Sequence, residues 1–192
     1  MSISKETIFN KALGFIGGPN QTSFIDNAET DDSTQAVWLR IVYNSALDYC
    51  AIDMLEDTFT EYRGLNQTTD SPETLDWAYA FERPSGMIHL VRLTNEGDRT
   101  QDFKYRQVGK YIFCDELTPF AEIIIPPEDS DMSTWPPGFS NMVSARMARE
   151  VGAIWKPEIV QLASLAYDAA RIEALEQRSV YEEPKEQWAD VS

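Results

Sequence analysis

Apolar residues recur every three or four positions in two N-terminal segments, a spacing that places them on one face of a helix. The first segment covers residues 3–16 and is followed by Gly-Gly-Pro at 17–19, a sequence that terminates helices. The second covers residues 30–55, and the Thr-Asp-Asp sequence at 30–32 places capping oxygens at its start. Its helical spacing is carried by Val37, Ile41, Ser45, Tyr49 and Ile52, with Trp38, Val42, Ala46 and Cys50 beside them.

The middle of the chain changes to the short, alternating runs that are typical of strands, separated by proline and glycine. We expect two hairpins among the last three runs, one turning at Val108-Gly109 and one near Leu117-Thr118-Pro119. The predicted strands are residues 58–62, 75–81, 87–93, 102–108, 110–115 and 120–125.

Helical spacing returns after residue 128 and predicts two further helices, over residues 138–155 and 157–178. Pro157 is suited to the first turn of the second of these helices. The buried face of the first is expected to hold Phe139, Met142, Val143, Met147, Val151 and Ile154. That of the second is expected to hold Ile159, Leu162, Ala163, Ala166 and Ala170.

The last fourteen residues, 179–192, are polar apart from Val180, Tyr181 and Trp188, and we expect them to form a mobile tail. A polar segment that carries a few apolar and aromatic side chains can become ordered on a partner. These three residues are therefore the candidate partner-interface residues of the sequence.

The order helix, helix, strands, helix, helix predicts an α+β fold. The N- and C-terminal helices are expected to form one helical bundle, with an antiparallel β module inserted between them. The predicted divisions are residues 1–56 for the N-terminal helices of the bundle, 57–127 for the inserted β module, 128–178 for the C-terminal helices and 179–192 for the tail.

Charge restricts the partners of the chain. Its 192 residues include 16 basic and 32 acidic side chains, a formal net charge of −16, which repels nucleic-acid phosphate and anionic lipid. Apolar runs long enough to span a membrane are missing from the sequence, and the N-terminal segment has charges inside its apolar pattern, unlike a signal peptide. We therefore expect a protein that folds in a cytoplasm, without membrane binding.

The residue types that carry catalysis form no recognisable motif. Nucleophile-elbow, metalloprotease, phosphate-loop and dinucleotide motifs are missing, and Cys50 and Cys114 have no metal-ligand spacing. The single histidine, His89, lies between Ile88 and Leu90 in a predicted strand, where we expect a structural role. Catalytic residues, cofactors and metal ions are therefore not expected.

Three blocks of the chain resemble the tail tubular protein A family, the head-to-tail adaptor (gatekeeper) of short-tailed bacteriophages. They are residues 77–93, 110–125 and 134–155, and the similarity spans roughly residues 5 to 176. The chain differs from the family pattern at 22–25 and 48–52. The residues that match the family motifs are Trp77, Tyr79 and Pro84, then Tyr111 to Asp115, then Pro136, Pro137, Phe139, Ala148 and Glu150, with ALGFIGGP at 12–19 and Tyr167 to Ala170 at either end.

The resemblance implies a structural protein of the virion neck. Family members assemble as a dodecameric homo-oligomeric ring between the portal protein and the tail nozzle protein, and viral DNA passes through the channel without sequence-specific binding. An acidic chain suits such a channel, because carboxylates facing the lumen repel DNA phosphate. We hypothesise separately that the three candidate interface residues let the tail become ordered on the portal; the alternative is a tail that stays unbound.

Two other classes of function remain open at this stage. A tail-associated glycan hydrolase would use a pair of carboxylates, one with a raised pKa, in an open cleft. A scaffold or binding module outside any phage could share the fold and have a different partner.

Overall fold

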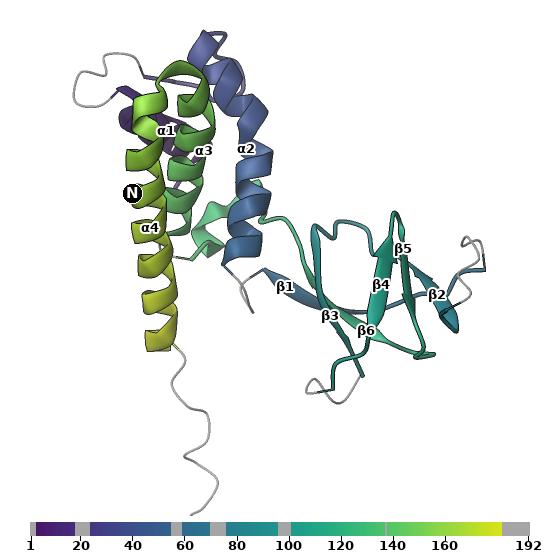
Figure 1. The fold of residues 1–192 in the computed structure, drawn as a ribbon. Helices are drawn as coiled ribbons and strands as arrows, with labels where there is room; N and C mark the ends of the chain where they lie inside the picture. The colour runs from purple at the N-terminus through teal and green to yellow at the C-terminus, as the bar shows by residue number, and fades with distance from the viewer. Residues whose placement is uncertain are drawn as a thin grey trace, which may run out of the picture. The chain divides into compact units, whose positions relative to one another are not determined.

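The computed structural model describes residues 3–17, 24–54, 59–69, 76–95, 101–136 and 138–181, with side chains up to residue 176. It confirms the predicted α+β class, with helices and small antiparallel sheets in one chain. The chain divides into two compact units (Figure 1). A helical unit comprises Met1–Met54 and Pro127–Ser192, and a β unit comprises Leu55–Pro126.

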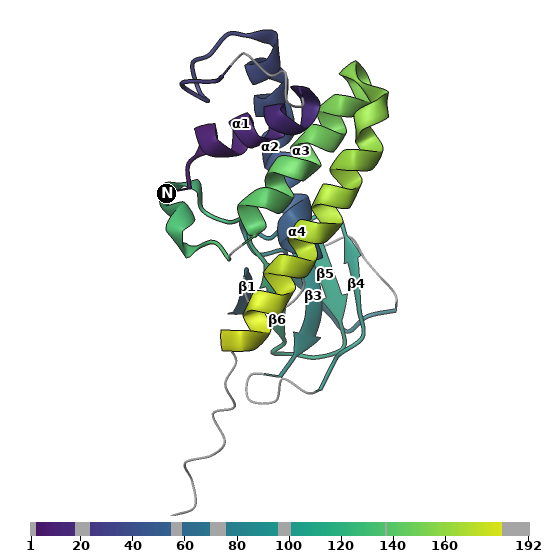
Figure 2. The same cartoon turned by 90° about the vertical axis from the view of Figure 1, so that its left-hand side faces the viewer.

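Within the described residues, four helices and two short 3-10 helices form the helical unit. Both views show α3 between α2 and α4, with α1 against α3 (Figures 1 and 2). The bounds are α1 Lys5–Gly17, α2 Thr34–Asp53, η2 Asp129–Thr134, α3 Phe139–Trp155, η3 Pro157–Ile159 and α4 Val160–Tyr181.

Ser33 determines where α2 begins. Its hydroxyl accepts a hydrogen bond from the Ala36 backbone N–H at 3.3 Å, and its own N–H donates to the Asp31 carboxylate at 2.8 Å. The predicted start at residue 30 is therefore four residues too early. Asp31 supports the cap from the preceding loop instead of capping the helix itself.

α3 is the central helix, and most of its sides are covered by the other helices. Phe139, Met142, Val143, Met147 and Val151 are all buried, as the sequence predicted. Ile154 is 57% exposed, so its assignment to the buried face was wrong. Ile154 thus lies on a side of the last turn that the other helices leave uncovered, whereas Gly152 of the same turn is buried.

The centre of the predicted apolar stripe of α2 is exposed, whereas Ala46 and Cys50 beside it are buried. The buried residues of the helix are Ala36, Leu39, Tyr43, Ala46, Leu47, Cys50 and Ala51. Val37, Ile41, Ser45 and Tyr49 are exposed, and Ile52 is half-buried. Both sets follow helical spacing, and the set with three alanines packs into the bundle, where small side chains allow close approach of helices.

α4 also turns a different face inward from the one predicted. Ala163 and Ala170 are buried as expected, but Leu162 is exposed and Ile159 and Ala166 are half-buried. The buried stripe continues with Tyr167 and Ala174.

The β unit consists of two three-stranded antiparallel sheets, with the orders β1-β6-β3 and β2-β5-β4. The hairpin of β4 and β5 is confirmed, and Gly109 at its turn has φ 57°. The predicted hairpin of β5 and β6 is wrong, because both edges of β6 are occupied by β1 and β3. The bounds are β1 Thr60–Gly64, β2 Tyr79–Glu82, β3 His89–Thr94, β4 Tyr105–Val108, β5 Tyr111–Cys114 and β6 Phe120–Ile124.

One ion pair lies inside the β1-β6-β3 sheet. Glu122 on β6 is buried and opposes Arg92 on β3, whose Nε donates to Glu122 Oε2. Arg92 is also paired with Asp102 at 3.6 Å and keeps part of its side chain in solvent. The pair fixes the register of β3 against β6, because a one-residue slip would bury Glu122 without a cation.

Replacing Gly138 by alanine should destabilise the helical unit. Gly138 has φ 82°, and an added Cβ would lie 3.1 Å from the Ala170 carbonyl oxygen. We expect a loss of about 2 kcal/mol in the free energy of unfolding from backbone strain alone, with a further loss from this contact. Urea denaturation measures it. The control is Gly86→Ala, at φ 77° with open space around it. Equal losses for the two variants would show that the contact with α4 contributes nothing.

Replacing Arg92 by methionine should leave Glu122 as an uncompensated buried charge. We expect the free energy of unfolding to fall by on the order of 3 kcal/mol. Arg63→Met is the matched control, since Arg63 pairs with the more exposed Glu61 on the same sheet and should cost less than about 1 kcal/mol. Thermal unfolding followed by circular dichroism compares the two variants. A loss for Arg92→Met no larger than the control's would contradict a structural role for the pair.

Candidate protein interface

An apolar stripe lies on the solvent side of α2. Val37 is 38% exposed, Ile41 63% and Tyr49 43%, and we call these three residues the α2 outer face. They are four and eight residues apart, so they follow one side of the helix. Half-buried Trp38 and Ile52 widen this side. Single exposed apolar residues are ordinary, but a stripe of them is typical of a contact surface.

The α2 outer face carries little charge. Arg40 is turned to the preceding loop, where its guanidinium donates to the carbonyl oxygens of Ala28 at 2.9 Å and Asp31 at 2.7 Å. Asp53 accepts a hydrogen bond from Tyr167. Asp48 is the remaining charged residue of α2, and partial burial raises the pKa of its carboxyl group.

A second apolar stripe lies on the solvent side of α4. Leu162 is 57% exposed, Leu165 60% and Ile172 54%, and we call these three residues the α4 outer face. Exposed Ala169 completes the spacing of three and four along the helix. Unlike the α2 outer face, this one is flanked by exposed carboxylates, those of Asp168, Glu173 and Glu176.

A polar node holds α4 to the end of α2. The Tyr167 hydroxyl donates to Asp53 Oδ2 at 2.7 Å, and Arg171 Nε forms an ion pair with the same oxygen at 3.1 Å. Tyr49 lies against the Tyr167 ring, with centroids 6.2 Å apart. These contacts fix the rotation of α4 about its axis, with the result that Leu162, Leu165 and Ile172 face solvent.

Burial changes the ionisation of groups at this node. It raises the pKa of the Cys50 thiol to about 12. It also raises the pKa of the Tyr167 hydroxyl, to which the neighbouring Cys50 and Asp53 contribute. Both groups are therefore neutral near pH 7, which suits a packing role and not nucleophilic chemistry.

A seam of paired side chains joins α2 to α3. Arg146 stacks on the Tyr49 ring at 3.8 Å from its centroid, and Ser45 donates to Glu150 at 3.4 Å. The pairs show that the helices are antiparallel, because the residue on α2 moves back from Tyr49 to Ser45 while its partner on α3 moves forward from Arg146 to Glu150. One turn further along the same two stripes, Ile41 lies level with Ile154, which is equally exposed.

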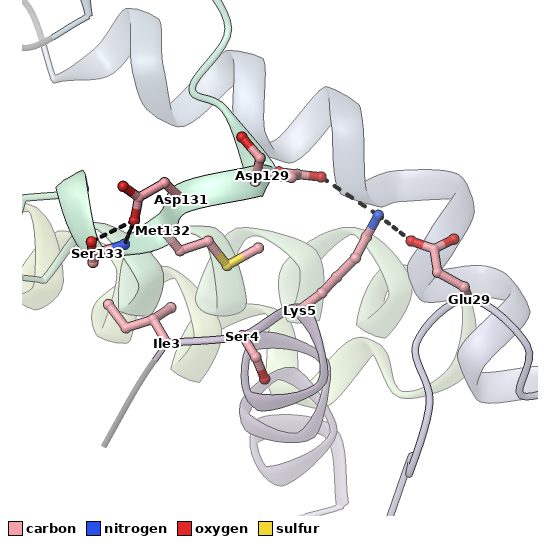
Figure 3. A pocket seen from close by; sticks show the side chains of 9 residues that line it. Ile3, Ser4, Lys5, Glu29, Asp129, Asp131, Met132 and Ser133 are labelled. Carbon is pink, nitrogen blue, oxygen red and sulfur yellow. Dashed lines mark hydrogen bonds and ion pairs between the residues drawn. The ribbon is translucent and has the colours of Figure 1, made fainter.

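A hollow of about 430 Å³ in the helical unit surrounds Lys5 at the start of α1 (Figure 3). Lys5 Nζ lies 2.7 Å from Glu29 Oε1 and 3.6 Å from Asp129 Oδ2, and 4.4 Å from the centre of the Tyr43 ring. The Tyr43 hydroxyl donates to Asp129 Oδ1 at 2.8 Å, and burial together with this carboxylate raises its pKa. Lys5 is held by groups of the chain itself, so the arrangement is a clamp between α1, α2 and η2.

A hollow of about 350 Å³ in the β unit contains Arg63 and Arg83. Arg63 donates to Glu61 at 2.6 Å and to the Ser85 carbonyl at 3.0 Å, and Arg83 donates to the Met87 carbonyl. Both guanidinium groups are thus bound within the chain. The hydrogen bonds in this hollow connect loops of the β unit to one another, and these two guanidinium groups are not free to bind an anion.

The structure corrects the predicted tail in part. α4 continues to Tyr181, so Val180 and Tyr181 belong to its last turn and the tail cannot begin at residue 179. Their side chains lie outside the described residues, as does Trp188. The candidate interface role of these three residues therefore stays a prediction.

The described residues form no recognisable catalytic arrangement. Within them, no group of three or more His, Cys, Asp or Glu is placed to hold a metal ion. His89 is exposed at the start of β3 and makes no polar contact in the described part of the chain. Asp48, whose carboxyl pKa is raised by burial, lines neither of the two hollows. No helix in the described ranges combines the length and apolar composition that crossing a membrane requires.

Comparison with known proteins adds no relative. The sequence matches no family model, and no curated protein matches it. Arguments about function therefore depend on the sequence motifs and on the geometry described above.

The two outer faces were missed as interfaces at the sequence level, although a signal was present. α2 is apolar around most of its circumference, and one face of such a helix can contact its own bundle while another contacts a partner. The sequence analysis took the exposed stripe of α2 as the centre of its apolar side and placed the interface in the tail.

We expect both native thiols to resist modification, since Cys50 and Cys114 are buried and burial raises the pKa of each. Ellman's reagent at pH 8 should release no thiolate chromophore from the folded chain over an hour. Two equivalents per chain should be released in concentrated urea. Rapid release of one equivalent from the folded chain would contradict the buried position of that cysteine.

Proposed function

We propose that the chain is a structural head-to-tail adaptor of a short-tailed bacteriophage. It assembles as a homo-oligomeric ring between the portal and the tail nozzle, and the ring surrounds a channel through which DNA passes. In this role the chain is a component of the virion and not an enzyme, and it needs no cofactor.

The exposed apolar faces of α2 and α4 carry this proposal. Six large apolar side chains remain outside the bundle although the chain has abundant charge to cover its surface. A protein whose work is assembly needs such faces, and the free energy of association comes from removing them from water. The motif order that resembles the adaptor family supports the same function.

The location of the polar contacts also supports an assembly role. The clamp around Lys5 and the node around Asp53 join helices to one another, and their partners lie within the same unit. Polar groups used in this way rigidify a subunit and set the orientation of its outer faces. A ring requires such rigidity because every subunit must present the same faces to its neighbours.

The glycan-hydrolase alternative receives less support. Glu29 and Asp129 come closest to a carboxylate pair in a hollow, but Lys5 bridges them and Tyr43 donates to Asp129. A glycosidase needs two carboxyl groups that are free to contact the substrate, whereas Glu29 and Asp129 are both paired with Lys5. A binding module outside any phage would differ from the adaptor in its partner alone.

Light scattering of the purified chain, alone and mixed with the portal protein of the same phage, tests the adaptor function. We expect a stoichiometric complex with the mass of a ring of chains on the portal. Because apolar burial is little affected by screening, the complex should persist when salt is raised from about 0.15 M to about 0.5 M. No association with the portal at any salt concentration would reject the proposal and direct attention to glycan cleavage.

A further inference from the structure

The two outer faces lie on different sides of the helical unit. α3 lies between α2 and α4 in both views (Figures 1 and 2), and the exposed side of each of these two outer helices carries its own apolar stripe. The faces also differ in chemistry, since the α2 outer face includes the Tyr49 ring, which stacks against Arg146 of α3, while the α4 outer face is aliphatic and flanked by carboxylates.

We propose that the α2 outer face of one copy packs against the α4 outer face of the next copy. This pairing rests on the proposed ring and names the surfaces that would form it. Two unlike patches on one subunit produce a head-to-tail contact, and a head-to-tail contact that closes produces a ring. A contact of either face with its own kind would stop at a dimer.

The exposed area suits a contact of this kind. Each of the six side chains leaves roughly 100 Å² outside the bundle, so pairing the two faces would cover about 600 Å² of apolar surface. A standard interface buries about 1,600 Å² in total, of which somewhat more than half is apolar. The two faces thus supply most of the apolar area of one such interface.

Charge favours the unlike pairing over either like pairing. Two α4 outer faces in contact would bring Asp168, Glu173 and Glu176 against the same carboxylates of another copy, which opposes association. Two α2 outer faces in contact would leave every α4 stripe exposed. When α2 meets α4, the carboxylates border a surface that carries the Arg146 guanidinium group, which stacks on the Tyr49 ring at 3.8 Å from its centroid.

The dimensions of the two helices also agree. α2 has 20 residues and α4 has 22, so both are about 30 Å long. Ridges spaced four apart on α2, at 37, 41, 45 and 49, can enter the grooves between residues spaced three and four apart on α4. This packing gives a small crossing angle of about 20°, at which two helices of this length stay in contact along most of their length.

Cysteine cross-linking between separately labelled copies tests the pairing. The variants Ile41→Cys and Leu165→Cys each add one exposed thiol to a chain whose own two cysteines are buried. We expect a short bis-maleimide to join the two variants into one heterodimer when they are mixed at high protein concentration. The double variant Ile41→Cys/Leu165→Cys should give a ladder of higher oligomers. Yields of the mixed dimer should exceed those of either variant alone by at least about tenfold.

Val108→Cys is the matched control, since Val108 is also an exposed apolar residue but lies on β4 of the other unit. Mixing it with Ile41→Cys should give no more product than random collision. The pairing is overturned if either variant cross-links to itself as well as to the other, if the control is equally efficient, or if no product forms at any concentration.

The proposed function and the proposed pairing can fail separately. A ring that assembles on the portal without a 41–165 cross-link would retain the adaptor function and reject this pairing of faces. A cross-linked ladder from a chain that never associates with the portal would retain the pairing and reject the adaptor function.

Discussion

Burial of α3 is the constraint on which the helical unit depends. Ten of its seventeen residues are buried, so α1, α2 and α4 must each give one face to it. Close approach is made possible by small residues, since an added Cβ at Gly152 would come within 2.6 Å of Ile159 and one at Gly138 within 3.1 Å of the α4 backbone. Alanines at 163, 170 and 174 serve the same purpose from the α4 side.

This arrangement determines what remains on the outside. A helix that packs on α3 through alanines has its larger apolar residues left for its other faces, and α4 shows this division. Its buried stripe is three alanines with Tyr167, while Leu162, Leu165 and Ile172 are exposed. The exposed stripe of α4 is thus a consequence of how tightly that helix packs on the core. Polar contacts at Asp53 and Glu150 then fix the direction in which the stripes point.

Sequence reasoning predicted the class of the fold and its helices and strands, because their periods differ clearly. It predicted α3 to within one residue and the β4-β5 hairpin from its glycine. It centred the apolar stripe of α2 on residues that are exposed, because apolar residues occur at helical spacing on more than one side of that helix and only the packing on α3 distinguishes the sides. It paired β5 with β6, because a short connection favours a hairpin, whereas β1 and β3, distant in sequence, occupy both edges of β6.

The candidate interface was less accessible from the sequence, for a physical reason. Hydrophobic periodicity reports that a side chain avoids water and does not report whether its own chain or another copy covers it. The tail residues Val180, Tyr181 and Trp188 stood out because their surroundings are polar, while Ile41 and Leu162 lie among apolar neighbours and were assigned to the apolar stripes of their helices. The distinction requires the coordinates, which show how much of each side chain its own bundle leaves exposed.

Acidity and apolar faces act against each other in this chain, and the balance bears on when it assembles. Copies that each carry a net charge of −16 repel one another over distances of about a Debye length, roughly 8 Å at physiological salt. Apolar contact acts only at van der Waals distance, so repulsion governs the approach of free copies and the stripes govern copies already in register. A surface that binds several copies side by side holds them together against this repulsion, so that the apolar stripes of neighbouring copies can come into contact. At low protein concentration, association of copies on a template would therefore be favoured over association of free chains, as the proposed adaptor function requires.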